Sequence, residues 1–279
     1  MILKYLGTAA AEGMPAVFCN CELCTNTRKK GDKNIRTRSQ ILIDSSTLID
    51  FPMDSYLHAL RYGIDLSAIS DVFITHAHMD HCYPQDFIMR CPPYAHNMTL
   101  PKVNVYGDEA VIEKFRTHTA DEIKPAAVES IGLNVLSPYD VVNTSSGMKV
   151  TALPACHTVG ENCLLYAAEK NGKTALIMND TGILDESVYK RMKDMGMKFD
   201  LVSFDCTYGG HGHGKGRHMG LPDNVGEREK MRAFGLVDDD TKYIVTHFSH
   251  NNGLLHDDIA SLAESYGMVA AYDGMEVEI

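Results

Sequence analysis

The sequence lacks a long hydrophobic run. Its longest uninterrupted apolar stretch is Cys163–Ala168, whereas a transmembrane helix needs about 18 or more apolar residues in succession. The opening residues, MILKYLGTAA, lack the charged segment and apolar core of a secretory signal peptide and are typical of a first β-strand. We therefore expect no association with a membrane and a cytoplasmic location.

Basic residues are scarce. The 279-residue chain has 26 Lys and Arg against 37 Asp and Glu, which gives a formal net charge of −11. Proteins that bind a nucleic-acid duplex usually cluster Lys and Arg on one surface. The densest basic stretch here, from Arg28 to Arg38, is short and is interrupted by Asp32. The charge balance therefore disfavours a nucleic-acid partner. The hydrophobic fraction of 44% and the charged fraction of 23% are those of a globular protein, which argues against disorder and coiled coil.

Cysteine is present in an informative pattern. Three of the eight cysteines, Cys19, Cys21 and Cys24, lie within six residues of one another. In a reducing cytosolic setting, such close spacing favours a metal site over a disulfide. The spacing supports three thiolate ligands and leaves the fourth ligand open.

Short apolar, β-rich runs alternate along the chain with helix-like stretches. Strands are predicted at Met1–Leu6, Ser39–Ile43, Thr47–Ile49, Asp71–Ile74, Lys102–Val105, Met148–Leu153, Cys163–Ala167, Thr174–Met178, Leu201–Phe204, Tyr243–Val245 and Met268–Ala271. Helices are predicted at Ser55–Tyr62, Glu109–Thr117, Glu186–Met195, Asn224–Phe234 and His256–Tyr266. Asp185 is placed to cap the third of these helices. The pattern predicts the α/β class, with sheets covered by helices. No repeat or linker marks a boundary, so we expect one domain over residues 1–279. The Gly- and His-rich residues 207–224 are expected to form a long functional loop.

The strongest local signal is the sequence THAHMDH at Thr75–His81. It follows directly on a short apolar run, and alternate residues of an extended segment point to the same side. His76 and His78 can therefore share one metal ion. Asp80 and His81 turn the corner and can face a second ion. Imidazole and carboxylate ligands together suit Zn²⁺, Mn²⁺ or Fe.

Four further candidate ligands stand at the ends of predicted strands: His157, Asp180, Asp205 and His247. Ligands in open α/β sheets gather outside the carboxyl ends of the strands. Taken singly, each residue could be a helix cap or a buried histidine with its hydrogen bonds satisfied. Together with the segment around His76, they predict one rim of ligands at a single sheet edge.

This order of ligands, HxHxDH and then one His, one Asp and one His at strand ends, resembles that of the metallo-β-lactamase-fold hydrolases over nearly the whole chain. The resemblance implies a four-layer αββα sandwich with a dinuclear metal centre at one edge of the two sheets. It implies that one ion is held by His76, His78 and His157, that the other is held by Asp80, His81 and His247, and that Asp180 bridges them. The two ions would be Mn²⁺ or Zn²⁺, with Fe as a further candidate.

Motifs spread from end to end narrow the resemblance to the phosphoribosyl 1,2-cyclic phosphate phosphodiesterases of the carbon–phosphorus lyase pathway. They are Gly7-Thr8, Gly13-Met14-Pro15, Cys19-Asn20-Cys21-Glu22-Leu23-Cys24, the segment around His76, Asp205-Cys206, Thr246-His247-x-Ser249-His250 and Asp273-Gly274-Met275-Glu276. In that family three cysteines and a histidine form a structural zinc site. The resemblance therefore implies a closed Cys₃His site of Cys19, Cys21, Cys24 and His250 in a Cys-rich zinc loop at residues 13–30. It also implies a homodimer.

The same resemblance implies hydrolysis of a small cyclic phosphate ester similar to a phosphoribosyl cyclic phosphate. Asp80 would act in the metal centre, and a histidine would protonate the leaving oxygen. His218 matches that histidine best, and His211 and His213 are rivals in the same Gly-rich loop. One departure is Ala9-Ala10-Ala11-Glu12, where the family has a Gly-rich stretch.

Two pairs of residues complete the predicted site. Asp50 and Asp205 are candidates to orient the ligand histidines from outside. Cys82 directly follows His81, and Cys156 directly precedes a candidate ligand. For both cysteines we expect a role as small buried hydrophobic residues.

Alternative functions share this metal pattern. Ribonuclease Z-type enzymes process tRNA 3′ ends, but they usually need a basic tRNA-binding arm, and no Lys/Arg-rich insertion is visible in this sequence. A non-catalytic metal-binding accessory protein is a second alternative, similar to the pyrroloquinoline quinone biosynthesis protein with its Cys-rich zinc site. A β-lactamase or a thioesterase is a weaker one. The complete set of seven ligand candidates favours catalysis.

Overall fold

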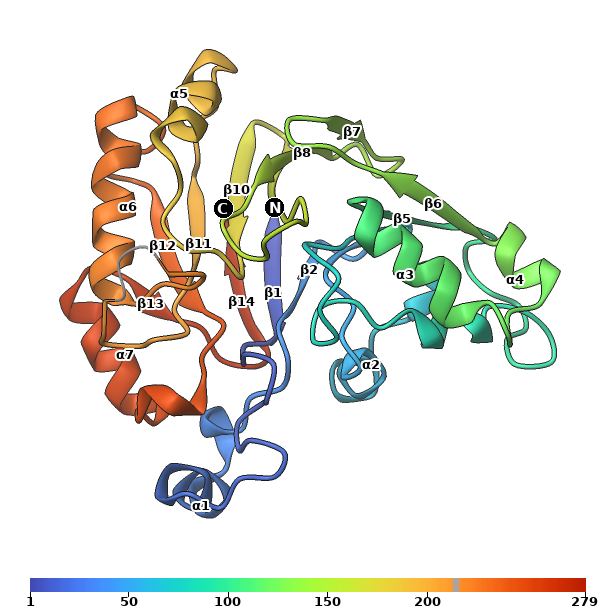
Figure 1. Cartoon of the computed structure of the whole chain (residues 1–279), viewed down its shortest axis with the longest axis horizontal. Coiled ribbons are helices and arrows are strands. Elements are labelled where there is room, and N and C mark those ends of the chain that lie inside the picture. Colours follow the sequence, from blue (N-terminus) through green and yellow to red (C-terminus); the bar gives the residue numbers. More distant parts are fainter. Residues whose placement is uncertain (213–215) are drawn as a thin grey trace.

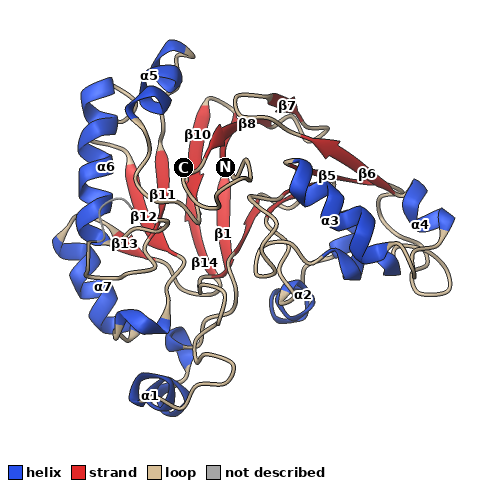
Figure 2. Ribbon diagram, viewed as in Figure 1, coloured by secondary structure: helices blue, strands red, loops and turns tan. Residues whose placement is uncertain are grey.

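A computed structural model describes residues 1–212 and 216–279 and contains two seven-stranded sheets (Figures 1 and 2). The first sheet has the order β14 (Met275–Glu278), β1 (Ile2–Gly7), β2 (Gln40–Ile43), β3 (Thr47–Ile49), β4 (Asp71–Phe73), β5 (Val103–Gly107) and β6 (Ile131–Val135). The second has the order β13 (Val269–Ala270), β12 (Lys242–Thr246), β11 (Leu201–Asp205), β10 (Lys173–Met178), β9 (Leu164–Lys170), β8 (Lys149–Pro154) and β7 (Val141–Asn143). The two ends of the chain meet in the first sheet, where β14 pairs antiparallel with β1.

Helices cover the outer faces of both sheets (Figure 1). The described helices are α1 (Glu22–Lys30), α2 (Ser55–Tyr62), α3 (Glu109–Thr119), α4 (Pro125–Glu129), α5 (Glu186–Asp194), α6 (Leu221–Phe234) and α7 (His256–Ser265). Buried residues of α5, α6 and α7 pack on the second sheet, and those of α3 pack on the first. As predicted, the Asp185 side chain caps α5 by accepting from the backbone of Ser187. Among the described residues, no helix has the length and apolar character to cross a membrane.

Besides the two apolar layers between helices and sheets, a third apolar core lies between the two sheets. It joins Leu3 and Tyr5 of the first sheet to Leu164 and Ile177 of the second, and all four are fully buried. Complete burial of a Leu or Ile side chain contributes about 1.5–3 kcal/mol, so this inner layer is a main source of stability. Helix, sheet, sheet and helix therefore stack in sequence, which confirms the predicted α/β sandwich.

The sheet topology brings several strand ends to one edge. In the first sheet β3, β4 and β5 run parallel, and in the second β10, β11 and β12 run parallel. Strand β8 has the direction of β10, because both are antiparallel to β9. The residues that follow β3, β4, β8, β10, β11 and β12 therefore gather at one edge of the sandwich, as the sequence predicted.

Some elements were not predicted, namely α1, α4, β6, β7 and β14. Helix α1 occupies half of the stretch 13–30, which the sequence analysis described as a loop. Cys21 caps this helix, Glu22 lies in its first turn, and Arg28–Lys30 lie in its last turn, so its charges complement the helix dipole. Helix α6 begins three residues earlier than the predicted Asn224, with Pro222 in its first turn, where proline is well tolerated.

A buried histidine predicts how stability responds to acid. His256 begins α7, and its Nδ1 lies 3.0 Å from Nη2 of Arg36, which can only donate. Burial and the positive charges of Arg36 and Lys33 lower the pKa of His256 from 6.5 to about 4. The unfolded chain therefore binds more protons between these pH values. The neutral His256 side chain therefore contributes to the free energy of unfolding above pH 6.5, and this contribution is lost as the pH falls toward 4.

The variant His256→Asn keeps an acceptor oxygen for Arg36 but removes the titration. Between pH 7 and pH 5, we expect the free energy of unfolding of the wild type to fall by about 2 kcal/mol more than that of the variant. Urea unfolding of both proteins at the two pH values measures this difference. Equal losses would show that His256 does not contribute to acid sensitivity.

Candidate metal centre

The segment after β4 is held in place by Asp50, the residue directly after β3. Oδ1 of this buried carboxylate accepts from the backbone N–H of Thr75 at 2.8 Å and from its hydroxyl at 2.9 Å. Oδ2 lies 2.7 Å from Nδ1 of His81. Such a contact fixes the tautomer and orientation of a ligand histidine, so it leaves Nε2 of His81 free to bind a metal ion. This is the orienting position expected for Asp50.

Three overlapping groups of potential ligands lie at this edge. One of them joins Asp205 and His218 to Asp180 and His247, and the other two contain the predicted ligands. Of these two, the first group is His76, His78, His157 and Asp180; the second is Asp80, His81, Asp180 and His247. Within each group the ligand atoms all lie within 4.8 Å of one another. The structure therefore brings together all seven side chains that the sequence analysis nominated for a dinuclear centre, and Asp180 belongs to both groups.

The carboxylate of Asp180 stands between the two groups. Its Oδ2 lies 3.3 Å from Nε2 of His76 and 2.7 Å from Nε2 of His81, and its Oδ1 lies 3.0 Å from Nε2 of His247. In the first group, Nε2 of His157 lies 3.2 Å from Nδ1 of His78. Asp180 therefore has the position of a bridging ligand.

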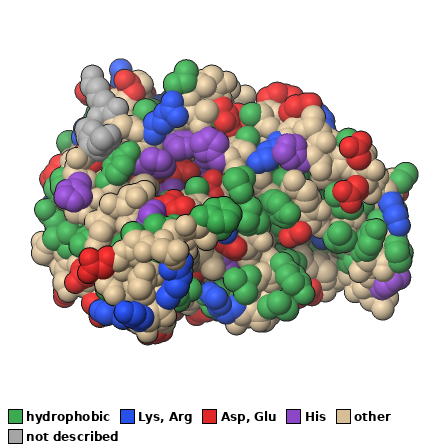
Figure 3. Space-filling model, turned by 60° about the horizontal axis from the view of Figure 1, so that its bottom comes forward, with side chains coloured by type: hydrophobic (Ala, Val, Ile, Leu, Met, Phe, Trp, Pro, Cys, Tyr) green, Lys and Arg blue, Asp and Glu red, His purple; other side chains and the backbone are tan. Residues whose placement is uncertain are grey.

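The donor atoms fit two divalent cations. The buried Nε2 atoms of His76, His81 and His247 and Oδ1 of Asp180 have no hydrogen-bond partner among the described residues. Orphaned buried polar atoms are costly in a folded protein, and a cation ligated by them would remove that cost. Figure 3 shows histidine and acidic side chains gathered in one hollow of the surface.

The carboxylates of this cluster are held in the anionic form. Burial alone would raise the pKa of Asp80, but the charge of His81 and the imidazole groups of His81 and His247 beside it lower the pKa. Burial of Asp180 is likewise outweighed by His247 and His81, which lower its pKa well below the ordinary range. Anionic oxygen and imidazole nitrogen are suitable ligands for Zn²⁺, Mn²⁺ and Fe.

Three residues of the site have left-handed backbone conformations. The φ angles of Asp50, Asp180 and His247 are 66°, 50° and 62°. Positive φ is uncommon outside glycine and often marks functional sites. Asp50 and His247 directly follow a strand, and Asp180 lies two residues after the end of β10. The turn of the backbone at each of these points directs the side chain into the cluster. Sequence patterns do not reveal this feature.

His218 lies at the border of the cluster. Its Nδ1 is 2.9 Å from Oδ2 of Asp205 and 3.2 Å from Oδ1 of Asp180. Burial lowers the pKa of His218, but the neighbouring carboxylates of Asp180 and Asp205 outweigh burial and raise the pKa to about 11. Asp205, directly at the end of β11, also accepts from the backbone of Thr207 and Met219, so its position is fixed.

Thr207 is a residue that the sequence analysis missed. Its hydroxyl donates to the backbone carbonyl of His247 at 3.0 Å and lies 2.9 Å from Nδ1 of the same histidine. It therefore accepts from Nδ1–H and turns Nε2 of His247 toward the metal cluster. An isolated threonine in a loop carries no pattern that could have indicated this role.

The rivals of His218 are placed differently. The exposed His211 belongs to none of the ligand groups among the described residues. His213 lies outside the described residues. Of the two described candidates, only His218 therefore contacts the cluster.

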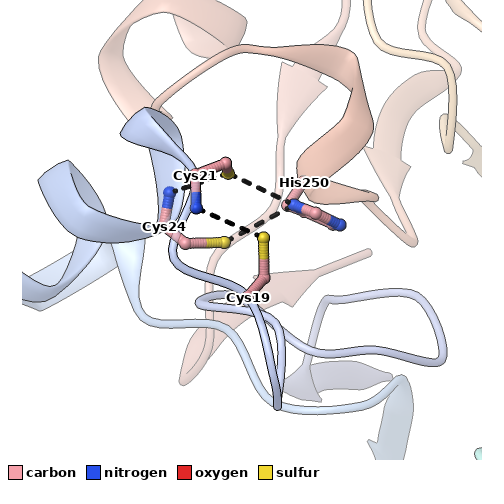
Figure 4. Close-up of side chains that lie close together, drawn as sticks. All are labelled: Cys19, Cys21, Cys24 and His250. Carbon is pink, nitrogen blue, oxygen red and sulfur yellow. Dashed lines mark hydrogen bonds between the residues drawn. The ribbon is translucent and has the colours of Figure 1, made fainter.

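The second predicted metal site also assembles (Figure 4). Cys19, Cys21 and Cys24 surround the start of α1, and Nδ1 of His250 lies 3.7 Å from Sγ of Cys21 and 3.5 Å from Sγ of Cys24. The four ligand atoms lie within 4.8 Å of one another. Hydrogen bonds from the Cys24 backbone and His250 lower the pKa of Cys21 to about 6, which favours the thiolate that binds metals. A Cys₃His set of this kind fits zinc.

Removal of one thiol tests this second site. We expect Cys24→Ser to lose one zinc ion per chain and to unfold at a lower temperature, because the site joins α1 to the loop after β12 and structural zinc contributes directly to folding. Elemental analysis and thermal unfolding measure the two effects. Cys156→Ser, which changes an exposed cysteine outside the four-ligand set, is the matched control. Full zinc occupancy in Cys24→Ser would contradict the assignment.

The two cysteines beside the ligands differ from each other. Cys82 is fully buried, as expected. Cys156 is exposed, so the expectation of burial was wrong for this residue. Its backbone N–H donates to the hydroxyl of Thr181 and its carbonyl accepts from Gly182. These bonds hold the backbone of Cys156 against the turn after β10, while its side chain faces solvent.

Comparison with known proteins agrees with this architecture. Residues 39–248 match the family model of the β-lactamase superfamily domain. Because this match covers most of the sequence, the chain belongs to the β-lactamase superfamily. No curated protein matches the sequence closely enough to count as a relative.

Solved structures share the fold at low sequence identity. A diphosphatase of the PhnP family is 21% identical with a TM-score of 0.76, over 100% of this chain and 97% of that one. Zn²⁺-bound PqqB from Methylobacterium extorquens is 16% identical with a TM-score of 0.77, over 100% of both chains. The short form of human tRNase Z is 16% identical with a TM-score of 0.66, over 100% and 99%. The predicted fold family is therefore confirmed, and the predicted class, a metal-dependent hydrolase, agrees with the hydrolases among these neighbours.

Proposed function

We propose that the protein is a dinuclear-metal-dependent phosphodiesterase that hydrolyses a small cyclic phosphate ester similar to a phosphoribosyl cyclic phosphate. The observation that carries this proposal is the position of Asp180 between two complete groups of ligands, with His218 beside it. The likeness to a PhnP-family diphosphatase supports the choice of a phosphate ester. We propose that the whole chain, residues 1–279, acts as one domain, since strands from both termini share the first sheet.

The ligand side chains would hold two divalent cations, Mn²⁺ or Zn²⁺ or else Fe. Such a pair supplies Lewis-acid polarisation of a phosphoryl group and a nucleophilic water at neutral pH. The protein fixes the ligands that hold it: Asp50 orients His81, Thr207 orients His247, and Asp180 keeps the two groups of ligands at a constant separation. The third ion, zinc, would occupy the Cys₃His site.

His218 would serve as the general acid. Its Nδ1–H donates to the Asp205 carboxylate, so that Nε2 points away from Asp205 and is available to the leaving oxygen. The proton passes from Nε2 of His218 to the ester oxygen as the phosphorus–oxygen bond breaks. Asp205 compensates the positive charge of the protonated ring. General acid catalysis of this kind typically contributes about 10²–10⁴-fold.

A parallel comparison of three substrates tests the proposal. A ribose 1,2-cyclic phosphate, a 2′,3′-cyclic nucleotide and a precursor tRNA would be offered in parallel to protein loaded with Mn²⁺ or Zn²⁺, with Asp80→Ala as the inactive control. We expect turnover of a cyclic phosphate that the variant loses. Cleavage of the tRNA alone would identify a ribonuclease Z-type endonuclease. No turnover of any substrate, with both ions bound, would favour a non-catalytic accessory protein.

A further inference from the structure

Two charged side chains outside the ligand groups converge on one residue of the metal-binding segment. Ala77 lies between His76 and His78, and its backbone N–H donates to Oε1 of Glu161 at 2.7 Å. Its carbonyl accepts from Nζ of Lys114 at 2.6 Å. We call this pair, Lys114 and Glu161, the Ala77 clamp. The two peptide groups that it holds are those that link the ligand histidines to each other.

The two members of the clamp come from different parts of the fold. Lys114 belongs to α3, and Glu161 lies in the loop between β8 and β9, which also carries His157. This loop is anchored independently, because Asp108, the N-cap of α3, accepts from the backbone of Asn162 at 3.2 Å. The clamp therefore connects all three histidines of the first ligand group through one local set of contacts.

The charges of the clamp have no evident use other than Ala77. Both side chains are partly buried, and neither forms an ion pair with any residue in the part of the chain that the structure describes. Ordering long charged side chains costs conformational entropy. Hydrogen bonds that involve an ionised group are roughly twice as strong as neutral ones. The two hydrogen bonds to the peptide groups of Ala77 therefore offset the entropy that is lost when Lys114 and Glu161 are ordered.

Fixing these peptide groups fixes the directions of the side chains beside them. The chain bends at Ala77 and His78, and the ligand atoms of His76 and His78 lie within 4.8 Å of each other. A rotation of either peptide group would turn one imidazole away from the point where their nitrogen atoms meet. Asp50 holds the two ends of the metal-binding segment, at Thr75 and His81, but it does not contact Ala77.

We propose that Lys114 and Glu161 are positioning residues that set the metal affinity of the half-site formed by His76, His78 and His157. This inference rests on the proposed metal centre and not on the identity of the substrate. The hydrogen bonds of the clamp act on backbone atoms. Loss of the clamp therefore changes the orientation of the ligand imidazoles without removing a ligand. Partners of this outer kind typically change metal affinity about 10–100-fold.

Metal affinity measured by chelator competition tests the proposal on the full chain. Lys114→Met keeps most of the side-chain stem and removes the ammonium group, and Glu161→Ala removes the carboxylate. We expect each to weaken the binding of one Mn²⁺ ion about 10–100-fold. The other ion and the zinc of the Cys₃His site should bind as before. Glu161→Gln, which keeps an acceptor oxygen, should lose less than Glu161→Ala.

Matched controls separate positioning from general damage. Arg116→Met removes a cation from the same helix, where Arg116 is exposed and pairs only with Glu109 and Glu113 among the described residues. This variant should bind both ions normally. In a His78→Ala background, where the half-site is already broken, Lys114→Met should cause no further loss of affinity.

Two outcomes would overturn the proposal. Unchanged affinity for both ions in Lys114→Met and Glu161→Ala would do so. An equal loss for both ions, together with a lower unfolding temperature of the metal-free protein, would show that the clamp is only structural. Because binding is read without any substrate, absence of phosphodiesterase activity would not affect this result.

Discussion

Asp180→Asn is expected to abolish hydrolysis. The substitution keeps the shape of the side chain but removes the negative charge that lies between the two ligand groups, with Nε2 of His81 at 2.7 Å and Nε2 of His247 at 3.0 Å. An amide cannot bridge two cations as a carboxylate does. We expect kcat/KM to fall by at least about 10³-fold, because even an outer partner of a metal ligand costs 10–100-fold.

The metal content of Asp180→Asn shows whether its loss of hydrolysis is caused by the missing carboxylate bridge. Elemental analysis of Asp180→Asn should show loss of active-site metal, with the zinc of the Cys₃His site retained. Asp194→Asn, at the exposed end of α5, makes the same chemical change away from the site and should leave activity and metal content unchanged. An Asp180→Asn protein with both ions and normal turnover would refute the bridging role.

His218→Ala is expected to lose activity in a way that depends on the leaving group. With a poor leaving group such as a ribose hydroxyl, the rate should fall about 10²–10⁴-fold, because the departing oxygen is no longer protonated. With p-nitrophenolate, which leaves without a proton, the loss should be small. Both active-site ions should remain bound, because His218 is not among the seven proposed ligands.

The exposed His211, seven residues earlier in the same loop, provides the control. His211→Ala should retain wild-type rates with both kinds of leaving group. Asp205→Asn should weaken the same protonation step, since Oδ2 of Asp205 lies 2.9 Å from Nδ1 of His218. Equal losses of His218→Ala with good and poor leaving groups would contradict the general-acid role.

The elements predicted best from the sequence are those whose burial follows a simple period. Strand β10 ends in the buried apolar run Ala175–Met178, and strand β11 is buried along its whole length and mostly apolar, as is typical of parallel strands covered on both faces. Strand β6, at the edge of the first sheet, is only partly buried along its length, so its sequence IGLNV carries no clear alternation. Helix α1 is short, has little apolar character, and depends on a cysteine as its cap.

The residues of the candidate site likewise divide into those that the sequence could predict and those that it could not. The metal-binding segment around His76 is local in sequence, so its chemistry could be predicted from spacing alone. The remaining ligands follow strands and could be predicted from the geometry of α/β sheets. His250 was nominated only through a resemblance to a family. Thr207, Lys114 and Glu161 act through one or two tertiary hydrogen bonds each, and no sequence pattern specifies such contacts.

The most direct test of the central claim is a titration of metal-depleted protein with Mn²⁺ while hydrolysis of a ribose cyclic phosphate is followed. The Cys₃His site would be kept filled with zinc. The proposed centre predicts that activity is absent at the start, rises with added metal, and saturates at two ions per chain, one for the group of His76, His78 and His157 and one for the group of Asp80, His81 and His247. Full activity without added metal, or saturation at a single ion, would contradict a dinuclear phosphodiesterase.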